Sequence, residues 1–404
     1  DGVSQPAALI AQAARLEMPA LALTDHDALY GQVDFWHAAA GSGVKPVVGA
    51  ELTLAGDCHL TLLAEDDRGY RNLSQLITEA RMRCTKGQAE ATWEQLVAYS
   101  HGLIALTGCR QGEVAKALRA GHPDVARKAL GRLQELFGPD RLFVEVQRQL
   151  RPGDERLSRA LISLAKQQRL PPVASNNVHY ARRQGHRLQD VLVAVRHRAT
   201  LDSSYHLRRG NSEAYLKGAA AMSRLFADCP DALANTLEIA GRCQVSLRHG
   251  VQDLPRFPTP VGLSAPGYLH QLCREAMLER YGSQPAQRVQ QLLQHELAVI
   301  GRLELANYFL VVWDIMRFSR EQGIRCQGRG SAANSLVAYL LRITPIDPLE
   351  HDLVFERFLS EERATLPDID IDFQADRREE VIQYVYNRYG RERAAMACTL
   401  VTFR

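Results

Sequence analysis

Short apolar runs alternate with helical stretches through the first half of the chain. Ala and Leu recur at helical spacing in the segments between these runs, at 5–16, 112–137 and 155–168. Strands that alternate with helices favour an α/β fold in which helices cover a parallel sheet. The predicted strands begin at Ala20, Pro46, His59, Leu103, Leu142 and Pro172.

Side chains of the metal-ligand type lie in or beside these predicted strands. His26 and Glu51 end two of them, His59 opens a third, and Cys109 and His179 follow later ones. In a barrel of parallel strands, residues from several strand ends converge on one site. A single His or Cys in a strand is more often a packed or hydrogen-bonded side chain than a ligand. The set as a whole predicts a metal site.

The segment 366–373 alternates carboxylate and apolar side chains. As a strand it would present Asp368, Asp370 and Asp372 on one face and apolar residues on the other. Three like charges on one face repel one another, so the arrangement is stable only in water or beside cations. The segment therefore predicts either a solvated edge strand or a site for divalent metal.

A glycine-rich segment lies upstream of the acidic strand, just before an apolar helical run that begins at Leu336. Gly328, Gly330 and Ser331 precede this helix start, whose free N–H groups suit a phosphate, and Arg329 adds a fork-shaped donor. Such a segment alone is more often a tight turn. Together with an Asp-x-Asp strand it favours nucleotidyl transfer, which needs donors for a triphosphate and carboxylates for two Mg²⁺ ions about 3.5–4 Å apart.

These motifs resemble the palm of C-family bacterial DNA polymerases, the family of the polymerase III alpha subunit. The resemblance implies that Asp368 and Asp370 are catalytic Mg²⁺ ligands, that Asp372 is a supporting residue, and that residues 328–331 bind the nucleotide triphosphate. The residues at 326–335 and 377–384 are most similar to those of the error-prone, damage-associated branch of the family. The strings that carry the resemblance lie at 308–310, 326–335, 355–359, 367–373 and 377–384.

The first half resembles the PHP (polymerase and histidinol phosphatase) domain that opens these polymerases. The strings that carry it are Thr24-Asp25-His26, Gly49-Ala50-Glu51, His59 before an apolar run, Gly108-Cys109 and Asn177-Val178-His179. The metal ligands implied by the resemblance, for Zn²⁺ or Mn²⁺, are Asp1, His26, Glu51, His59, Cys109 and His179.

Two departures from the PHP pattern predict weak or partial metal occupancy. The opening His-x-His pair of the family would precede Asp1 and is absent from this sequence. Asn177 stands where metal-competent relatives carry aspartate, and an amide has no charge to offset the ion.

The implied fold class is α/β, with a PHP-type distorted β/α barrel at 1–245 and the first part of a mixed α/β, nucleotidyltransferase-like palm at 246–404. A proline-rich stretch at 254–260 marks the boundary. The family's third catalytic aspartate, its fingers and its oligonucleotide-binding module would lie beyond Arg404. The chain by itself is therefore expected not to extend a primer.

The composition of the chain is compatible with several functions and does not identify one. The net charge of +3 is too small to indicate nucleic-acid binding. The eight cysteines include no Cys-x-x-Cys pair, which favours a reduced, cytoplasmic setting. No apolar run approaches the ~20 residues of a membrane span. Both ends look cut, since Asp1 is not methionine and the segment 399–404 reads as part of a strand.

The resemblance implies a DNA-directed DNA polymerase of the error-prone type, used in damage-tolerant (translesion) synthesis. Its partners would be primer-template DNA and deoxynucleoside triphosphates, with a sliding clamp and other damage-tolerance proteins bound through regions beyond this chain, and no membrane. Three alternatives stay open. They are a replicative polymerase III alpha subunit, a metal-dependent PHP phosphoesterase or exonuclease, and a PHP half that serves as a structural platform.

Overall fold

The computed structural model describes residues 2–247, 255–360 and 367–397. The chain divides into two compact units, residues 1–248 and 249–404, which are described separately below. Among the described helices, none is both long enough and apolar enough to cross a membrane.

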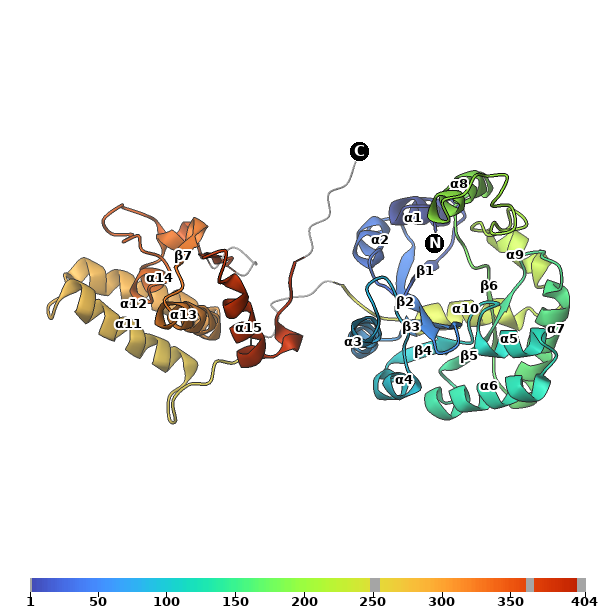
Figure 1. Cartoon of the computed structure of the whole chain (residues 1–404), viewed down its shortest axis with the longest axis horizontal. Helices are drawn as coiled ribbons and strands as arrows, with labels where there is room; N and C mark the ends of the chain where they lie inside the picture. Colours follow the sequence, from blue (N-terminus) through green and yellow to red (C-terminus); the bar gives the residue numbers. More distant parts are fainter. Residues whose placement is uncertain (1, 248–254, 361–366, 398–404) are drawn as a thin grey trace. The chain divides into compact units, whose positions relative to one another are not determined.

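Unit 1 is built on one curled sheet of six strands, arranged in the order in which they occur in the sequence (Figure 1). Each predicted apolar run lies in one of these strands, because a short buried run bounded by turn residues has no room for a helix. The α/β fold class is confirmed, with a half-barrel sheet. The strands are β1 Ala20–His26, β2 Lys45–Leu54, β3 Cys58–Ala64, β4 Leu103–Leu106, β5 Leu142–Gln147 and β6 Pro172–Ser175.

The expectation of an all-parallel sheet is wrong for β3, which runs antiparallel to both β2 and β4. The connection between β2 and β3 contains Gly56 and Asp57, both with positive φ, at 75° and 56°. Such a short turn joins antiparallel strands, whereas parallel neighbours need a crossover of a dozen or more residues. The hairpin brings His59, near the start of β3, opposite Thr53 of β2.

Helices surround this sheet (Figure 1). The apolar side chains of the strands and helices together form the buried core. The predicted helix at 112–137 is two helices, because Gly121, with φ of 80°, and Pro123 interrupt it. The polar segment 206–243 is helical only at Ala219–Leu225 and Asp231–Arg242. The helices are α1 Pro6–Arg15, α2 Gln32–Ala39, α3 Asp67–Arg83, α4 Trp93–Tyr99, α5 Glu113–Arg119, α6 Pro123–Phe137, α7 Asp154–Gln168, α8 His186–Arg196, α9 Ala219–Leu225 and α10 Asp231–Arg242, with a 3₁₀ turn at Arg183–Gly185.

Unit 2 is mainly helical and contains a two-stranded antiparallel sheet of β7 and β8. Its core forms where α11, α12, α13 and α14 pack together, and the apolar side of β8 packs against that core. The elements are α11 Ala265–Tyr281, α12 Gln287–Arg302, α13 Ala306–Glu321, β7 Cys326–Arg329, α14 Leu336–Leu340, β8 Asp370–Phe373 and α15 Arg378–Tyr389, with 3₁₀ turns at Gly330–Asn334, Phe355–Arg357 and Arg391–Arg393.

A buried carboxylate ties α15 to α13 in unit 2. The Asp314 side chain is fully buried and accepts hydrogen bonds from Arg317 Nη2 at 2.8 Å, Tyr384 Oη at 2.7 Å and Tyr389 Oη at 2.8 Å. Although burial alone would raise the pKa of Asp314, these three donors outweigh it and lower the pKa. The network fixes the helix that follows the acidic strand.

Candidate functional site

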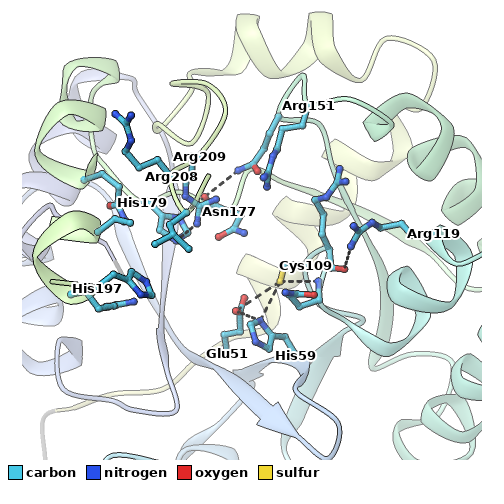
Figure 2. Close-up of a pocket in the computed structure, with 17 residues that line it drawn as sticks. Glu51, His59, Cys109, Arg119, Arg151, Asn177, His179, His197, Arg208 and Arg209 are labelled. Carbon is cyan, nitrogen blue, oxygen red and sulfur yellow. Dashed lines mark hydrogen bonds and ion pairs between the residues drawn. The ribbon is translucent and has the colours of Figure 1, made fainter. Parts of the chain in front are cut away.

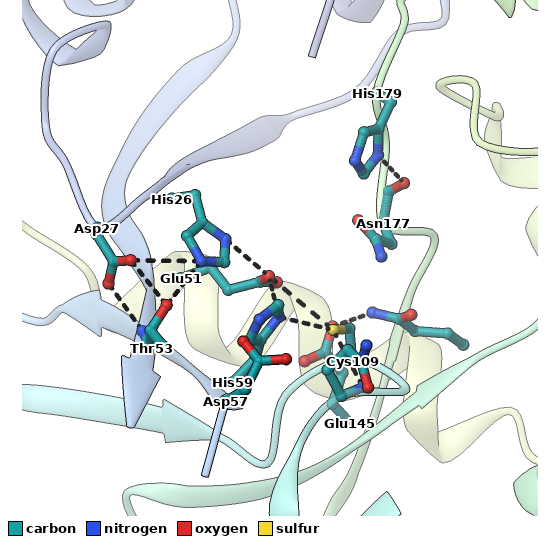
Figure 3. A network of polar contacts seen from close by, with 12 residues as sticks. His26, Asp27, Glu51, Thr53, Asp57, His59, Cys109, Glu145, Asn177 and His179 are labelled. Carbon is teal, nitrogen blue, oxygen red and sulfur yellow. Dashed lines mark hydrogen bonds and ion pairs between the residues drawn. The ribbon is translucent and has the colours of Figure 1, made fainter. Parts of the chain in front are cut away.

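Three predicted ligands of unit 1 meet at one end of the curled sheet (Figure 3). Glu51 Oε1 lies 2.8 Å from His59 Nδ1 and 3.3 Å from His26 Nδ1. One ligand atom from each of the three residues lies within 4.8 Å of the others. Strands β1 and β2 are parallel and pair His26 with Glu51, while the β2–β3 hairpin supplies His59. The sheet therefore assembles a two-histidine, one-carboxylate cluster.

The cluster is electrostatically coupled. Burial works to raise the pKa of Glu51, but hydrogen bonds from His26 and His59 dominate and lower it to about 2. The hydrogen bond to Glu51 raises the pKa of His26. On its other side, His26 Nε2 contacts Thr53 Oγ1 at 2.8 Å, and that hydroxyl donates to Asp27 Oδ2 at 2.7 Å. These contacts orient the ring, as second-layer hydrogen bonds do around metal-binding histidines.

Cys109, after β4, borders the cluster. Its Sγ lies 3.3 Å from His59 Nδ1 and 3.9 Å from Glu51 Oε1. Burial, with the charge of Glu51, raises the pKa of Cys109 to about 12, so its thiol is protonated near neutral pH. A bound cation would favour the thiolate, which is the form that ligates metal.

His179 does not join the cluster. Its Nδ1 donates to the Asn177 carbonyl at 2.9 Å (Figure 3), and its Nε2 is hydrogen-bonded by Arg209 Nη2 (Figure 2). Burial and the Arg209 charge lower the pKa of His179 to about 4, so the ring is neutral. Asn177 has a φ of 43°, a conformation that Asn and Asp adopt more readily than most residues. Asp1 lies outside the described residues.

The donor set of the cluster fits a catalytic-type metal centre. Two histidines and one carboxylate are a ligand set that zinc sites use when a fourth position stays open. The side chains of His26, Glu51 and His59 are 29%, 19% and 16% exposed, so the cluster is accessible from solvent. His26, Glu51 and His59 would hold the ion, with Cys109 beside it.

The acidic segment of unit 2 has the predicted alternation. Asp368, Asp370 and Asp372 are exposed, whereas the residues between them are half-buried. Only Asp370 and Asp372 lie within β8, and Asp368 precedes the strand. Arg329 Nε lies 3.2 Å from Asp372 Oδ1, and Arg329 Nη1 lies 3.8 Å from Asp370 Oδ2. The guanidinium predicted to contact phosphate is thus paired with the acidic face.

The glycine-rich turn lies beside this acidic face because β7 and β8 pair directly, with Arg329 opposite Asp370. Gly330 has a φ of 73°, and a Cβ built there would lie 3.6 Å from Asp370 Oδ2. At Gly328 a Cβ would lie 2.5 Å from the Ile343 carbonyl oxygen, which also accepts the Gly328 N–H at 2.8 Å. Both glycines are therefore required by the local geometry.

The start of α14 differs from the prediction of free N–H groups. Glu296 Oε1 accepts the Leu336 N–H at 2.8 Å, and Glu296 Oε2 accepts the Val337 N–H at 3.0 Å and the Ser335 hydroxyl at 2.8 Å. Ser335 Oγ in turn accepts the Ala338 N–H at 3.1 Å. A protein carboxylate occupies this helix start, so any phosphate contact falls to the preceding turn at 328–331.

Two protein families match the chain in separate regions. The PHP domain family matches residues 1–149, and the family described as the bacterial DNA polymerase III alpha NTPase domain matches residues 267–404. An error-prone DNA polymerase of Symbiobacterium thermophilum is 44% identical over the whole chain, and one of Mycolicibacterium paratuberculosis is 42% identical. The DNA polymerase III subunit alpha of Escherichia coli K12 is 39% identical. The chain belongs to the bacterial DNA polymerase III alpha family.

The chain spans 38% of the length of both error-prone relatives and 36% of the Escherichia coli subunit, while all of its own length is matched. Among solved structures, an amidohydrolase from Chromobacterium violaceum matches with a TM-score of 0.33 at 17% identity, covering 44% of this chain and 84% of that one. In this polymerase III alpha family chain, the PHP match contains the cluster and the NTPase match contains the β7–β8 hairpin.

Residues that no sequence motif singled out also shape the sites of this family member. Glu145, in β5, is buried, accepts hydrogen bonds from Gln147 and Ser175 through Oε1, and has no partner for Oε2 among the described residues. Burial raises its pKa. In the sequence, a glutamate within an otherwise apolar strand is the feature that could have indicated a functional residue here. Arg209 and Glu296 gave no comparable signal, because each acts on residues far along the chain.

Proposed function

We propose that this chain is part of an error-prone DNA polymerase that performs template-directed synthesis with deoxynucleoside triphosphates on primer-template DNA, including past DNA damage. The observation that carries the proposal is the β7–β8 pairing, which sets the glycine turn against the acidic strand. The higher identity to error-prone relatives than to the Escherichia coli replicative subunit favours this branch over a replicative polymerase. The setting would be cytoplasmic, where bacterial DNA is copied.

In this proposal Asp368 and Asp370 would hold Mg²⁺, which neutralises developing charge during nucleotidyl transfer. Gly328, Gly330 and Ser331 would contact the triphosphate, since glycine lets the backbone approach a phosphate closely. Arg329, now paired with Asp370 and Asp372, would be released toward the phosphates once cations neutralise the acidic face.

Isosteric changes at the acidic strand test the proposal. In the full-length polymerase that contains these residues, Asp368→Asn and Asp370→Asn should each lower the primer-extension rate about 1,000-fold or more. Each variant removes a negative charge from a metal site. Asp372→Asn, the matched control, should cost far less. Equal losses at all three positions, or full activity of the first two variants, would contradict the assignment.

We propose for the PHP half that His26, Glu51 and His59 bind Zn²⁺ or Mn²⁺. Their convergence within 4.8 Å favours this second function over a purely structural platform. A cation at this position would offset the negative charge of Glu51 and be ligated by the neutral rings of the two histidines. Phosphoester hydrolysis would follow only if the bound metal activates water, as metal hydrolases do.

Metal analysis separates these possibilities. Zn²⁺ or Mn²⁺ should raise the melting temperature of the wild-type chain but not of His59→Ala, and metal-dependent 3′-exonuclease activity should disappear in that variant. Metal stabilisation without nuclease activity would support a structural metal. Equal melting curves with and without metal would refute metal binding.

A further inference from the structure

One tyrosine of α13 contacts the backbone of the acidic segment. Tyr308 lies in the first turn of α13 and is half-buried, with its ring packed against the core of unit 2. Its hydroxyl oxygen accepts a hydrogen bond from the Ile369 N–H at 3.2 Å. The contact joins two residues that are 61 positions apart in the chain, so packing of separate elements brings them together.

Ile369 lies between Asp368 and Asp370, the two proposed Mg²⁺ ligands. The pairing of β8 with β7 ends at Asp370, which lies opposite Arg329, and beyond that pair the Ile369 N–H has its partner in Tyr308. The Ile369 side chain packs against the core of unit 2. Because side chains alternate along an extended segment, this placement directs the two neighbouring carboxylates toward solvent, where both are exposed.

The part of α13 that carries Tyr308 is itself fixed. Phe309 and Leu310, the next two residues, are fully buried in the core. On the other side, the Asn307 side chain accepts the Phe257 N–H at 2.9 Å. The Tyr308 hydroxyl therefore lies on a rigid element, which is what a group that orients metal ligands requires.

We propose that Tyr308 is a positioning residue for nucleotidyl transfer, which holds Asp368 and Asp370 in place through the Ile369 N–H and so sets the affinity of the acidic strand for Mg²⁺. This role rests on the proposed function. Two-metal catalysis requires its carboxylates at defined positions, and small displacements lower the rate. Groups that orient metal ligands through hydrogen bonds contribute to metal affinity although they do not touch the ion.

The Mg²⁺ dependence of primer extension by the full-length polymerase tests this role. Tyr308→Phe keeps the ring and removes only the oxygen that accepts the Ile369 N–H. The Mg²⁺ concentration that gives the half-maximal rate should rise about fivefold or more, because a hydrogen bond that holds the acidic segment is lost. The matched control is Tyr268→Phe, since Tyr268 is also half-buried in unit 2 but packs against Trp313. Its Mg²⁺ dependence should equal that of the wild type.

Metal binding provides a second measurement, which does not depend on activity. Mn²⁺ binding to the same polymerase is followed by electron paramagnetic resonance, with His59→Ala in every protein so that the unit 1 cluster does not contribute. The part of the binding that Asp370→Asn removes belongs to the acidic strand. Tyr308→Phe should weaken that part about fivefold or more, and Tyr268→Phe should leave it unchanged.

The outcomes separate the positioning role from the proposed function. If Asp370→Asn loses activity while Tyr308→Phe keeps the wild-type Mg²⁺ dependence and Mn²⁺ affinity, the positioning role alone is overturned. A lower melting temperature of Tyr308→Phe with unchanged Mg²⁺ dependence, or equal shifts in Tyr308→Phe and Tyr268→Phe, would indicate a purely structural residue and would also overturn it. Full activity of Asp370→Asn would overturn the proposed function together with the role of Tyr308.

Discussion

Replacing the buried Glu296 should change both the stability of unit 2 and the pH dependence of that stability. Its carboxylate is fully buried and accepts hydrogen bonds from Ser335, Leu336 and Val337. Burial raises the pKa of Glu296 from 4.5 to about 7, despite these donors. In the folded state the group therefore holds its proton to a higher pH than in the unfolded state.

The sign of the pH effect follows from that difference. Between pH 4.5 and about 7 the folded state binds more protons at Glu296 than the unfolded state, so the free energy of unfolding falls as pH rises and then levels off. At ~1.4 kcal/mol per pKa unit, the loss from this group amounts to about 3 kcal/mol. In Glu296→Gln the amide does not titrate, so this part of the pH dependence disappears.

Glu296→Gln has a second, pH-independent cost. Its single carbonyl oxygen can still accept from Ser335 and Val337, but its NH₂ group faces the Leu336 N–H, and two donors cannot pair. One buried N–H without an acceptor costs about 1–3 kcal/mol. The variant should therefore be less stable than wild type at pH 5, and the difference should shrink or reverse at pH 8.

Urea unfolding at pH 5, 6, 7 and 8 measures these effects. Trp313 lies in unit 2, so its fluorescence reports unit 2 alone when Trp36 and Trp93 are replaced by Phe in every protein compared. Glu275→Gln, an exposed change on α11, is the matched control and should alter stability by no more than ~0.5 kcal/mol. Parallel pH dependence of wild type and Glu296→Gln would refute the reasoning.

Two other changes in unit 2 have definite expected outcomes. Gly328→Ala places a Cβ 2.5 Å from the Ile343 carbonyl oxygen and should lower the melting temperature. Its control is Gly301→Ala in α12, which should keep or raise the melting temperature, because no atom lies within 4 Å of the added Cβ and alanine favours a helix. Equal melting temperatures of the two variants would contradict the close approach at Gly328. Asp314→Asn should lower the free energy of unfolding by about 3 kcal/mol at pH 7, because it breaks a buried charged network. Since the pKa of Asp314 is lowered, its stabilisation is present above pH 3.8 and is lost in more acidic solution, so a difference that persists unchanged at pH 2 would be inconsistent with this role.

Local patterns in the sequence predicted the strands of unit 1 and the acidic alternation of unit 2. Short apolar runs fixed the strand positions, and the orientation of β3 was readable from Gly56 and Asp57, which form a hairpin turn. The contact of Arg209 with His179 and that of Glu296 with the start of α14 join residues 30 and about 40 positions apart. No local periodicity encodes such contacts, since they depend on how separate elements pack.

Helix α14 is held at both ends from elsewhere in unit 2. The Glu296 carboxylate of α12 accepts hydrogen bonds from N–H groups at the start of α14. The Ile343 carbonyl, just beyond the end of α14, accepts the N–H of Gly328 in β7. The position of the turn at 328–331 therefore depends on two buried groups, the Glu296 carboxylate and the Ile343 carbonyl. A change to either of these buried groups would shift the turn relative to Asp370 while every exposed residue of the site stays intact. Under the proposed function, a substitution in the core of unit 2 would therefore lower nucleotide affinity.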